Sequence, residues 1–256
     1  MNFSDFEEIL LHAMPILLRV AGIMTFAPFF GGAAISPRLK AAFTLVLTVL
    51  LYPVCRPGPT SGAPQNWVAI VFSETVLGLG MGLCLQFIVE AAQLAGQVAG
   101  FQFSFSLVNV IDPQSNVDTT VLSIFHQLIA LLFFLQFDAH HWVLRGVAKS
   151  FLYVPIGTSV VSSALMTELF RTAGAMFLVG VQIATPLLLA TFLVDLTVGF
   201  LSKASPQMPA IFLSIPLKSL TGYAVLAIAV GLWPAFFEKQ FVHALSWSER
   251  LLRLAH

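Results

Sequence analysis

Long apolar runs dominate the pattern of hydrophobic and polar positions along this chain of 256 residues. Turn-forming clusters such as RPGPTSGAPQ at residues 56–65 separate the runs, because Gly and Pro interrupt helices. Each run reaches about the 20 residues that a helix needs to cross a bilayer. The pattern therefore predicts about six long helices, which begin near Ile9, Ala41, Trp67, Thr119, Thr172 and Ile211.

Charged residues and prolines lie inside several of these predicted helices. Charged groups are costly against lipid, so we expect them to face protein or water. The flanking basic residues give only a weak orientation under the positive-inside rule. We therefore expect long, kinked helices buried inside a larger assembly rather than a plain six-span monomer. The interior residues are Arg19, Glu74, Glu90, His126 and Asp195, together with Pro15, Pro28 and Pro186.

The predicted third helix carries two contrasting faces. At about 100° per residue, one carboxylate and three amides fall in a narrow polar stripe of Gln86, Glu90, Gln93 and Gln97. Such a stripe favours water or polar partners over lipid. Glycines at a spacing of four also lie on this helix and allow another backbone to approach closely, although simple helix packing explains them equally well. They are Gly78, Gly82, Gly96 and Gly100.

Directly after this helix, Phe alternates with polar residues in FQFSFSLVNV at residues 101–110. An extended backbone places the three rings on one side, and at membrane depth it is tolerated only where protein buries it or where it lines a cavity. We expect a re-entrant loop that forms a pore constriction, because large apolar side chains exclude water; a short amphipathic helix packed in a core is the alternative. Asp112 and Pro113 close the loop with a turn. The expected constriction residues are Phe101, Phe103, Phe105, Leu107 and Val110.

Composition indicates a membrane protein, and the long apolar runs predict that its fold class is all-α. The chain is 58% hydrophobic and 9% charged, with a mean hydropathy of +0.91, whereas soluble domains contain about a quarter charged residues. The formal net charge is zero and the basic residues are scattered. This balance argues against nucleic-acid binding.

Candidate catalytic and metal-binding residues are few. Asp138, His140 and His141 form a short cluster, but adjacent His side chains point in different directions on a helix or a strand, so we expect no metal site. Asp195, inside an apolar helix, fits a proton relay or, preferably, an ion pair with Lys203 or with a neighbouring subunit. The sequence contains no GxSxG, P-loop or GxGxxG motif. We therefore expect neither enzymatic activity nor a cofactor.

Three stretches carry a resemblance to a known family. They are AAQLAGQVAGFQFSFSLVNVIDPQSN at residues 91–116, FDAHHWVLRGVAKSFLYVPIG from Phe137, and VDLTVGFLSKASPQMPAIFLSIPLK from Val194. These stretches resemble the FliR family of flagellar export-gate membrane proteins. The resemblance covers nearly the whole chain. The residues from Asp138 to His141 favour the flagellar proteins over the related injectisome export-gate subunits.

This resemblance implies a structural, non-catalytic subunit of a hetero-oligomeric funnel for unfolded flagellar proteins, in the basal body at the bacterial inner membrane. Its implied partners are FliP-like and FliQ-like subunits and FlhB-like and FlhA-like proteins, besides membrane lipid. It also implies one FliR-type domain over residues 1–256, with a FliP-like part at 1–160, a FliQ-like helical hairpin at 161–256 and a channel plug at 101–110. The expected subunit contacts are the four glycines of the third helix with Asp195, Lys203, Pro206, Pro216 and Lys218.

Two functions of other classes remain as alternatives. A self-contained, proton-coupled secondary transporter would use Glu90 and Asp195 as coupling acids, although such transporters usually contain internal repeats, and no long repeat appears in this sequence. A membrane-embedded hydrolase would use His140 and His141. An export-gate subunit requires partner subunits, whereas the transporter acts as a single protein species.

Overall fold

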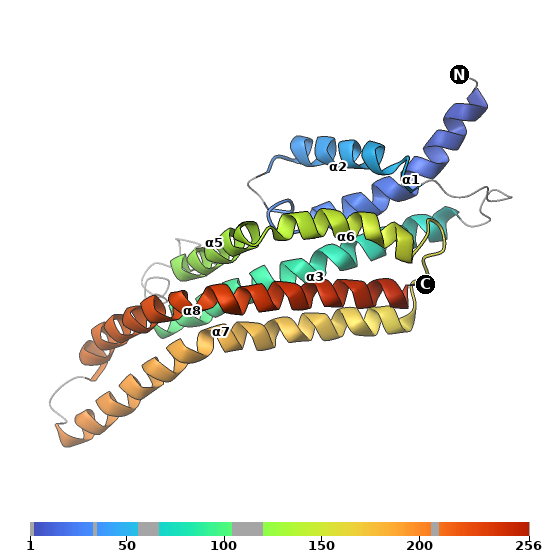
Figure 1. Ribbon diagram of the computed structural model, residues 1–256. Helices are drawn as coiled ribbons and strands as arrows, with labels where there is room; N and C mark the ends of the chain where they lie inside the picture. The colour runs from blue at the N-terminus through green and yellow to red at the C-terminus, as the bar shows by residue number, and fades with distance from the viewer. Residues whose placement is uncertain (1–2, 33–34, 56–66, 104–119, 206–209, 256) are drawn as a thin grey trace, which may run out of the picture. The chain divides into compact units, whose positions relative to one another are not determined.

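The described part of the chain contains helices and no strands. The structure, a computed structural model, describes residues 3–32, 35–55, 67–103, 120–205 and 210–255 (Figure 1). The all-α fold class expected from the apolar runs is confirmed. The helices are α1 (Phe3–Phe26), α2 (Pro37–Leu51), α3 (Trp67–Gln102), α5 (Val121–Gln136), α6 (Ala139–Tyr153), α7 (Ser163–Ala204) and α8 (Ala210–Leu254).

Three of these helices are long and apolar enough to cross a membrane. They are α3 with 36 residues, α7 with 42 residues, and the 43 residues of α8 that begin at Phe212. The consecutive helices α5 and α6 pass the same test only as a pair separated by a sharp bend, which raises the number of possible spans to four. Six apolar runs therefore do not correspond to six spans, because α2 is short and the apolar part of α1, from His12 to Phe26, is short as well.

The chain divides into two compact units, and each unit combines segments that are distant in sequence. One unit contains Met1–Phe87, Phe134–Gly174 and Phe241–His256, and the other contains Ile88–Phe133 and Ala175–Gln240. Both units draw on residues before and after position 160. The division into a FliP-like part and a FliQ-like part at that position stays a prediction.

In the first unit, the end of α8 runs beside the start of α7. The backbone N–H of Val160 donates to the carbonyl oxygen of Ala255 at 2.9 Å, and the Ser162 hydroxyl donates to the carbonyl oxygen of Leu254 at 3.1 Å. The carboxylate of Glu168 lies 3.7 Å from the Arg250 guanidinium. These contacts hold the carboxy-terminal end of the chain against the beginning of α7, as Figure 1 shows.

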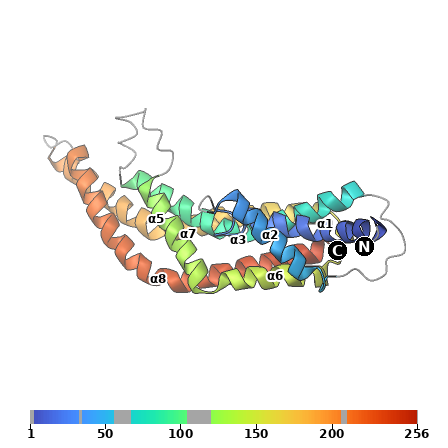
Figure 2. The ribbon, with the colours of Figure 1, turned by 90° about the horizontal axis from the view of Figure 1, so that it is seen from above.

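The second unit has an aromatic core between α5 and α8. The ring of His126 lies 4.9 Å from that of Trp233, and the ring of Phe133 lies 5.4 Å from that of Phe237. In the same unit, α7 packs closely on α3 at Gly180, because a Cβ added there would lie 2.9 Å from the Leu94 side chain. Figure 2 shows α5, α7 and α8 from above.

Candidate functional site: helix seams, buried charges and the end of the third helix

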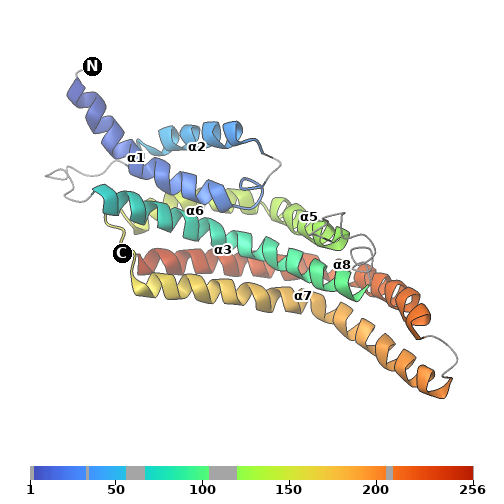
Figure 3. The same cartoon turned by 180° about the vertical axis from the view of Figure 1, so that it is seen from behind.

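Glycine residues on α1 and α3 let the two helices meet backbone to backbone within the first unit. A Cβ added to Gly22 would lie 2.8 Å from the amide nitrogen of Leu79, and one added to Gly82 would lie 2.8 Å from the carbonyl oxygen of Ile23. A Cβ on Gly78 would collide with the backbone of Arg19. The close approach expected at Gly78 and Gly82 is present, but the neighbour is α1 of the same chain rather than another subunit (Figure 3).

A buried ion pair lies at this seam. The Arg19 Nε atom is 2.6 Å from Glu74 Oε2, and both side chains are 0% exposed. The sequence predicted that each residue would face protein or water, and the structure shows that they face each other. Nothing in the sequence links the two, because they are 55 positions apart.

Backbone and hydroxyl groups provide further partners for this pair, while Arg19 Nη2 has no hydrogen-bond partner within the described residues. Arg19 Nη1 donates to the carbonyl oxygens of Ser150 at 3.0 Å and Val154 at 2.9 Å, and the guanidinium lies 4.3 Å from the centre of the Phe151 ring. Glu74 Oε1 accepts from the Gly157 amide at 3.2 Å and from the Ser159 hydroxyl at 3.1 Å. The two charges thereby tie α1, α3, α6 and the segment after α6 together. We call these residues the Arg19–Glu74 clamp.

A second glycine seam joins α3 to the start of α5 within the second unit. A Cβ at Gly96 would lie 2.6 Å from the carbonyl oxygen of Leu122, and one at Gly100 would lie 2.7 Å from the Thr120 side chain. The Ser123 hydroxyl also donates to the carbonyl oxygen of Gln93 at 3.1 Å. Here too the close neighbour is a segment of the same chain, whereas both glycines were expected to contact another subunit.

The polar stripe of α3 lies at the margin of the packed surface. Gln86, Glu90, Gln93 and Gln97 are all half-buried in the isolated chain, while the intervening Ile88, Ala92 and Ala95 are fully buried. Its contact with a pore or another subunit stays a prediction.

The end of α3 differs from the sequence expectation. The helix continues through Gln102, and the Phe103 amide still donates to the carbonyl oxygen of Ala99 at 3.0 Å. The extended backbone expected from the Phe alternation is therefore wrong for residues 101–103, because the helical hydrogen bonds persist there. Phe105, Leu107, Val110, Asp112 and Pro113 lie outside the described residues.

Phe101 and Phe103 have opposite environments at this helix end. Phe103 is 2% exposed and its ring lies 5.4 Å from that of Tyr223, in the space left by the missing side chain of Gly222. Phe101 is 63% exposed. Phe103 is thus part of the core of the second unit, and of these two rings only Phe101 is available to a partner or a pore.

Asp195 of α7 forms an ion pair with Lys218 of α8. Lys218 Nζ lies 2.7 Å from Asp195 Oδ1, and the two side chains are 17% and 47% exposed respectively. The sequence favoured Lys203 or another subunit as the partner, and the structure corrects the partner to Lys218. Lys203 is exposed in the last turn of α7, and Pro216 lies within α8; Pro206 is outside the described residues.

Asp138 separates α5 from α6 and gathers the two adjacent His residues. It adopts a left-handed conformation with φ of 54°, and its Oδ1 lies 3.3 Å from His141 Nδ1 and 3.9 Å from His140 Nε2. The three potential ligand atoms lie within 4.8 Å of one another. The expectation that adjacent His side chains diverge is therefore wrong here, because both follow the tight turn at Asp138. His126 does not belong to this cluster: its Nδ1 lies 2.8 Å from the carbonyl oxygen of Leu122 in the other unit.

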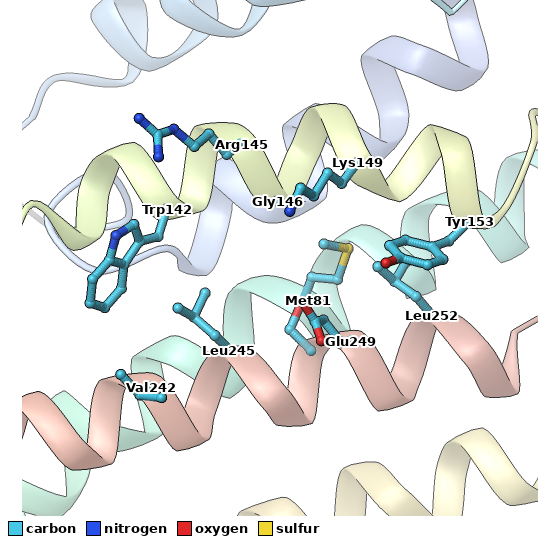
Figure 4. A pocket seen from close by; sticks show the side chains of 11 residues that line it. Met81, Trp142, Arg145, Gly146, Lys149, Tyr153, Val242, Leu245, Glu249 and Leu252 are labelled. Atoms are coloured by element: carbon cyan, nitrogen blue, oxygen red, sulfur yellow. The ribbon is translucent and has the colours of Figure 1, made fainter.

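A groove of about 260 Å³ runs between α6 and the last part of α8 in the first unit. Sequence reasoning missed it, although α6 repeats aromatic and basic residues at helical spacing. Figure 4 shows side chains of both helices facing the groove, with Met81 of α3 behind them. Its lining residues are Met81, Trp142, Arg145, Gly146, Lys149, Tyr153, Val242, Leu245, Ser248, Glu249 and Leu252.

Comparison with known proteins identifies similar chains over nearly the same length. The family described as bacterial export proteins, family 1, matches residues 10–244. The flagellar biosynthetic protein FliR of Bacillus subtilis (strain 168) is 27% identical over 219 residues, which cover 84% of this chain and 85% of that protein. FliR of Escherichia coli (strain K12) is also 27% identical, over 88% of this chain and 86% of its own. The surface presentation of antigens protein SpaR of Shigella flexneri is 27% identical over 88% of both chains.

Proposed function

This chain belongs to family 1 of the bacterial export proteins, and from that premise we propose that it is a structural subunit of the flagellar type III protein export gate. The match over residues 10–244 carries the proposal, because it extends from within α1 through α7 to most of α8. Similarity to flagellar biosynthetic proteins from several bacteria supports the flagellar assignment.

The proposed role is to form part of the channel wall without catalysing a reaction. Its polar and charged interior residues support a scaffold role, since Arg19 and Glu74 neutralise each other and Asp195 is bound to Lys218. A coupling acid of a transporter must exchange protons during the transport cycle. A carboxylate held 2.7 Å from an ammonium group favours a fixed ion pair over such a cycle.

The proposed partners are FliP-like and FliQ-like subunits in the bacterial inner membrane, with FlhB-like and FlhA-like proteins nearby and unfolded flagellar proteins as the cargo. Exposed apolar side chains on α7 and α8 support burial against other subunits or lipid. They include Phe170, Phe177, Leu193, Phe200, Phe212, Leu220 and Leu232, each more than half exposed.

The proposed constriction is the segment that begins at Phe101. The 63% exposure of Phe101 at the end of α3 supports a position where its ring meets another chain or the pore. Residues 105–110 complete the constriction in this proposal, and Asp112 with Pro113 ends it.

A complementation experiment tests the proposal. The chain is expressed together with the rest of its operon in a host strain from which the host's FliR-family subunit has been deleted. Swimming motility and the intact mass of the complex in detergent are then measured. We expect motility and one large complex that contains the FliP-like and FliQ-like proteins. A monomer or homodimer that moves a small solute into liposomes would instead support the transporter.

A second function in the same class is an injectisome export-gate subunit. Its supporting observation is the 27% identity to SpaR of Shigella flexneri over 88% of each chain. Complementation of a second strain, which lacks its injectisome export-gate subunit, separates the two. An injectisome subunit would restore secretion in that strain and would leave the flagellar mutant without motility.

A further inference from the structure

One stripe of α6 lines the groove in the first unit. Trp142, Gly146, Lys149 and Tyr153 follow one another at spacings of four, three and four residues. Residues at these spacings lie on one face of a helix, and Arg145 adjoins them. The groove therefore has one wall in which two basic residues lie between two amphipathic aromatic rings.

The opposite wall and the floor are mostly apolar. Val242, Leu245 and Leu252 of α8 face α6 across the groove (Figure 4), and Met81 of α3 lies behind them with 4% exposure. Glu249 is the acidic residue of the lining, so two cations face one carboxylate. The groove combines an apolar floor with a net positive rim.

Gly146 leaves the middle of the groove open. A Cβ added at this position would meet no heavy atom within 4 Å, in contrast to the glycines of the helix seams. Helix packing therefore does not require glycine at this position. A side chain placed there would occupy the groove without displacing the backbone.

We propose that this groove binds one anionic phospholipid, with the phosphate at Arg145 and Lys149 and an acyl chain over Leu245, Leu252 and Met81. Basic pockets between helices recognise anionic head groups. Trp and Tyr favour the depth of the membrane interface, where an aromatic ring meets lipid on one side and water on the other. The positive charge of the rim favours a lipid with a negative head group over a zwitterionic one. The apolar floor accommodates the acyl chain of either lipid.

Native mass spectrometry of the full chain, purified with its export-gate partners in detergent, tests the proposal. Phosphatidylglycerol and phosphatidylcholine with the same acyl chains are the probes. Near an anionic surface, each basic residue contributes a factor of about five in affinity. We therefore expect the double substitution of Arg145→Gln and Lys149→Gln to weaken phosphatidylglycerol binding about 25-fold and to leave phosphatidylcholine binding unchanged.

A second variant separates lipid binding from general electrostatics. Gly146→Leu keeps both cations and fills the groove, so it should abolish the bound phosphatidylglycerol while the complex stays assembled. Its matched control is Gly231→Leu, since Gly231 also has nothing within 4 Å of an added Cβ but lies outside the groove. Lys239→Gln, at an exposed position outside the groove, controls for the loss of charge.

Two outcomes would overturn the proposal. Equal phosphatidylglycerol binding by the wild type, the double variant and Gly146→Leu would place the lipid elsewhere. A photoreactive amino acid at position 146 that crosslinks to a protein in cells would show that a partner subunit occupies the groove. Neither readout depends on export activity, so failure here is distinguishable from failure of the proposed function.

Discussion

The burial of individual charged residues in this protein is made possible by the groups that they contact. Arg19 and Glu74 are fully buried, yet their mutual contact and the carbonyl oxygens of Ser150 and Val154 satisfy most of their hydrogen-bonding groups. Removing one member of a buried pair leaves the other charge without compensation, which costs more than the intact pair contributes. The clamp is therefore a site where single substitutions have large effects on folding.

Substitution of either clamp residue tests this conclusion. We expect Arg19→Met and Glu74→Met to lower the free energy of unfolding by about 3–5 kcal/mol each, and the double variant to lose less than the sum, because neither charge is then stranded. Unfolding of the detergent-solubilised protein, analysed as a double-mutant cycle, measures the coupling. The more exposed Glu168–Arg250 contact at 3.7 Å is the control, with an expected coupling of about 0–1 kcal/mol. Additive losses at the clamp would contradict the conclusion.

The Asp195–Lys218 pair gives a smaller expected effect. Its carboxylate is half-exposed in the isolated chain, and exposed ion pairs contribute little. Asp195→Asn should therefore lower the free energy of unfolding of the isolated chain by about 0.2–1 kcal/mol and leave export intact. Lys203→Gln should change neither, since Lys218 is the partner. Export assays with unfolding midpoints check both variants, and loss of export with unchanged stability in Asp195→Asn would revive the proton relay.

At the scale of the helices, glycines fall into two classes. Those of the seams, such as Gly78 and Gly96, contact the backbone of another helix, whereas Gly146 and Gly231 face open space. Seam glycines permit a helix separation that no other residue allows. Glycines in open space weaken the helix, because they have greater freedom in the unfolded chain, and Gly146 also keeps the groove open.

Alanine substitutions should therefore have opposite signs in the two classes. Gly96→Ala places a Cβ 2.6 Å from the Leu122 carbonyl oxygen, and we expect overpacking to cost about 1–3 kcal/mol. Gly231→Ala should stabilise the protein by up to about 1 kcal/mol through helix propensity. Thermal unfolding of the two variants in the same detergent compares them directly. Melting temperatures that shift in the same direction in both variants would refute the distinction.

Helix boundaries also show what the sequence was able to predict. The long apolar runs identify α3, α7 and α8, because length and hydropathy are properties of each segment alone. The break at Asp138 was missed, since its left-handed backbone with φ of 54° is a response to its surroundings. The continuation of α3 to Gln102 was missed because the alternation of Phe and polar residues favours a strand only when helical hydrogen bonds are unavailable.

Partner choice was the other limit of prediction. The glycine spacing on α3 predicts close contact, but a glycine face is the same surface whether a helix of this chain or of another subunit covers it. Likewise, the sequence shows that Arg19 and Glu74 need protein around them without showing that they meet. Only the three-dimensional structure assigns Gly78 to α1, Gly96 to α5 and Asp195 to Lys218.

For the whole molecule, the proposed channel depends on surfaces that the isolated chain leaves uncovered. Phe101 and Phe103 are two positions apart, yet one is 63% exposed and the other 2% exposed. A residue of the core stabilises the fold, whereas an exposed ring at a pore controls passage. Substitutions at these two positions can therefore test the proposed gating role and the folding role independently.

Single Phe to Ala substitutions in the assembled complex test this separation. Phe103→Ala should lower the free energy of unfolding by about 3–5 kcal/mol, as for other buried Phe residues. Phe101→Ala should leave unfolding unchanged and make the gate leaky to small solutes, measured as dye or ion flux in cells that overexpress the complex. Unchanged permeability in a variant that also carries Phe105→Ala would remove the segment from the constriction.

The Arg19–Glu74 clamp also constrains how the protein is made. A ribosome completes Arg19 well before Glu74, which is 55 residues later, and before Ser150, which is 131 residues later. Until then the guanidinium of the nascent chain has none of its final partners, and a long basic side chain in that situation extends toward the aqueous interface. We therefore expect α1, although it is synthesised first, to complete its packing only after α6 has emerged from the ribosome and the partners of Arg19 are present.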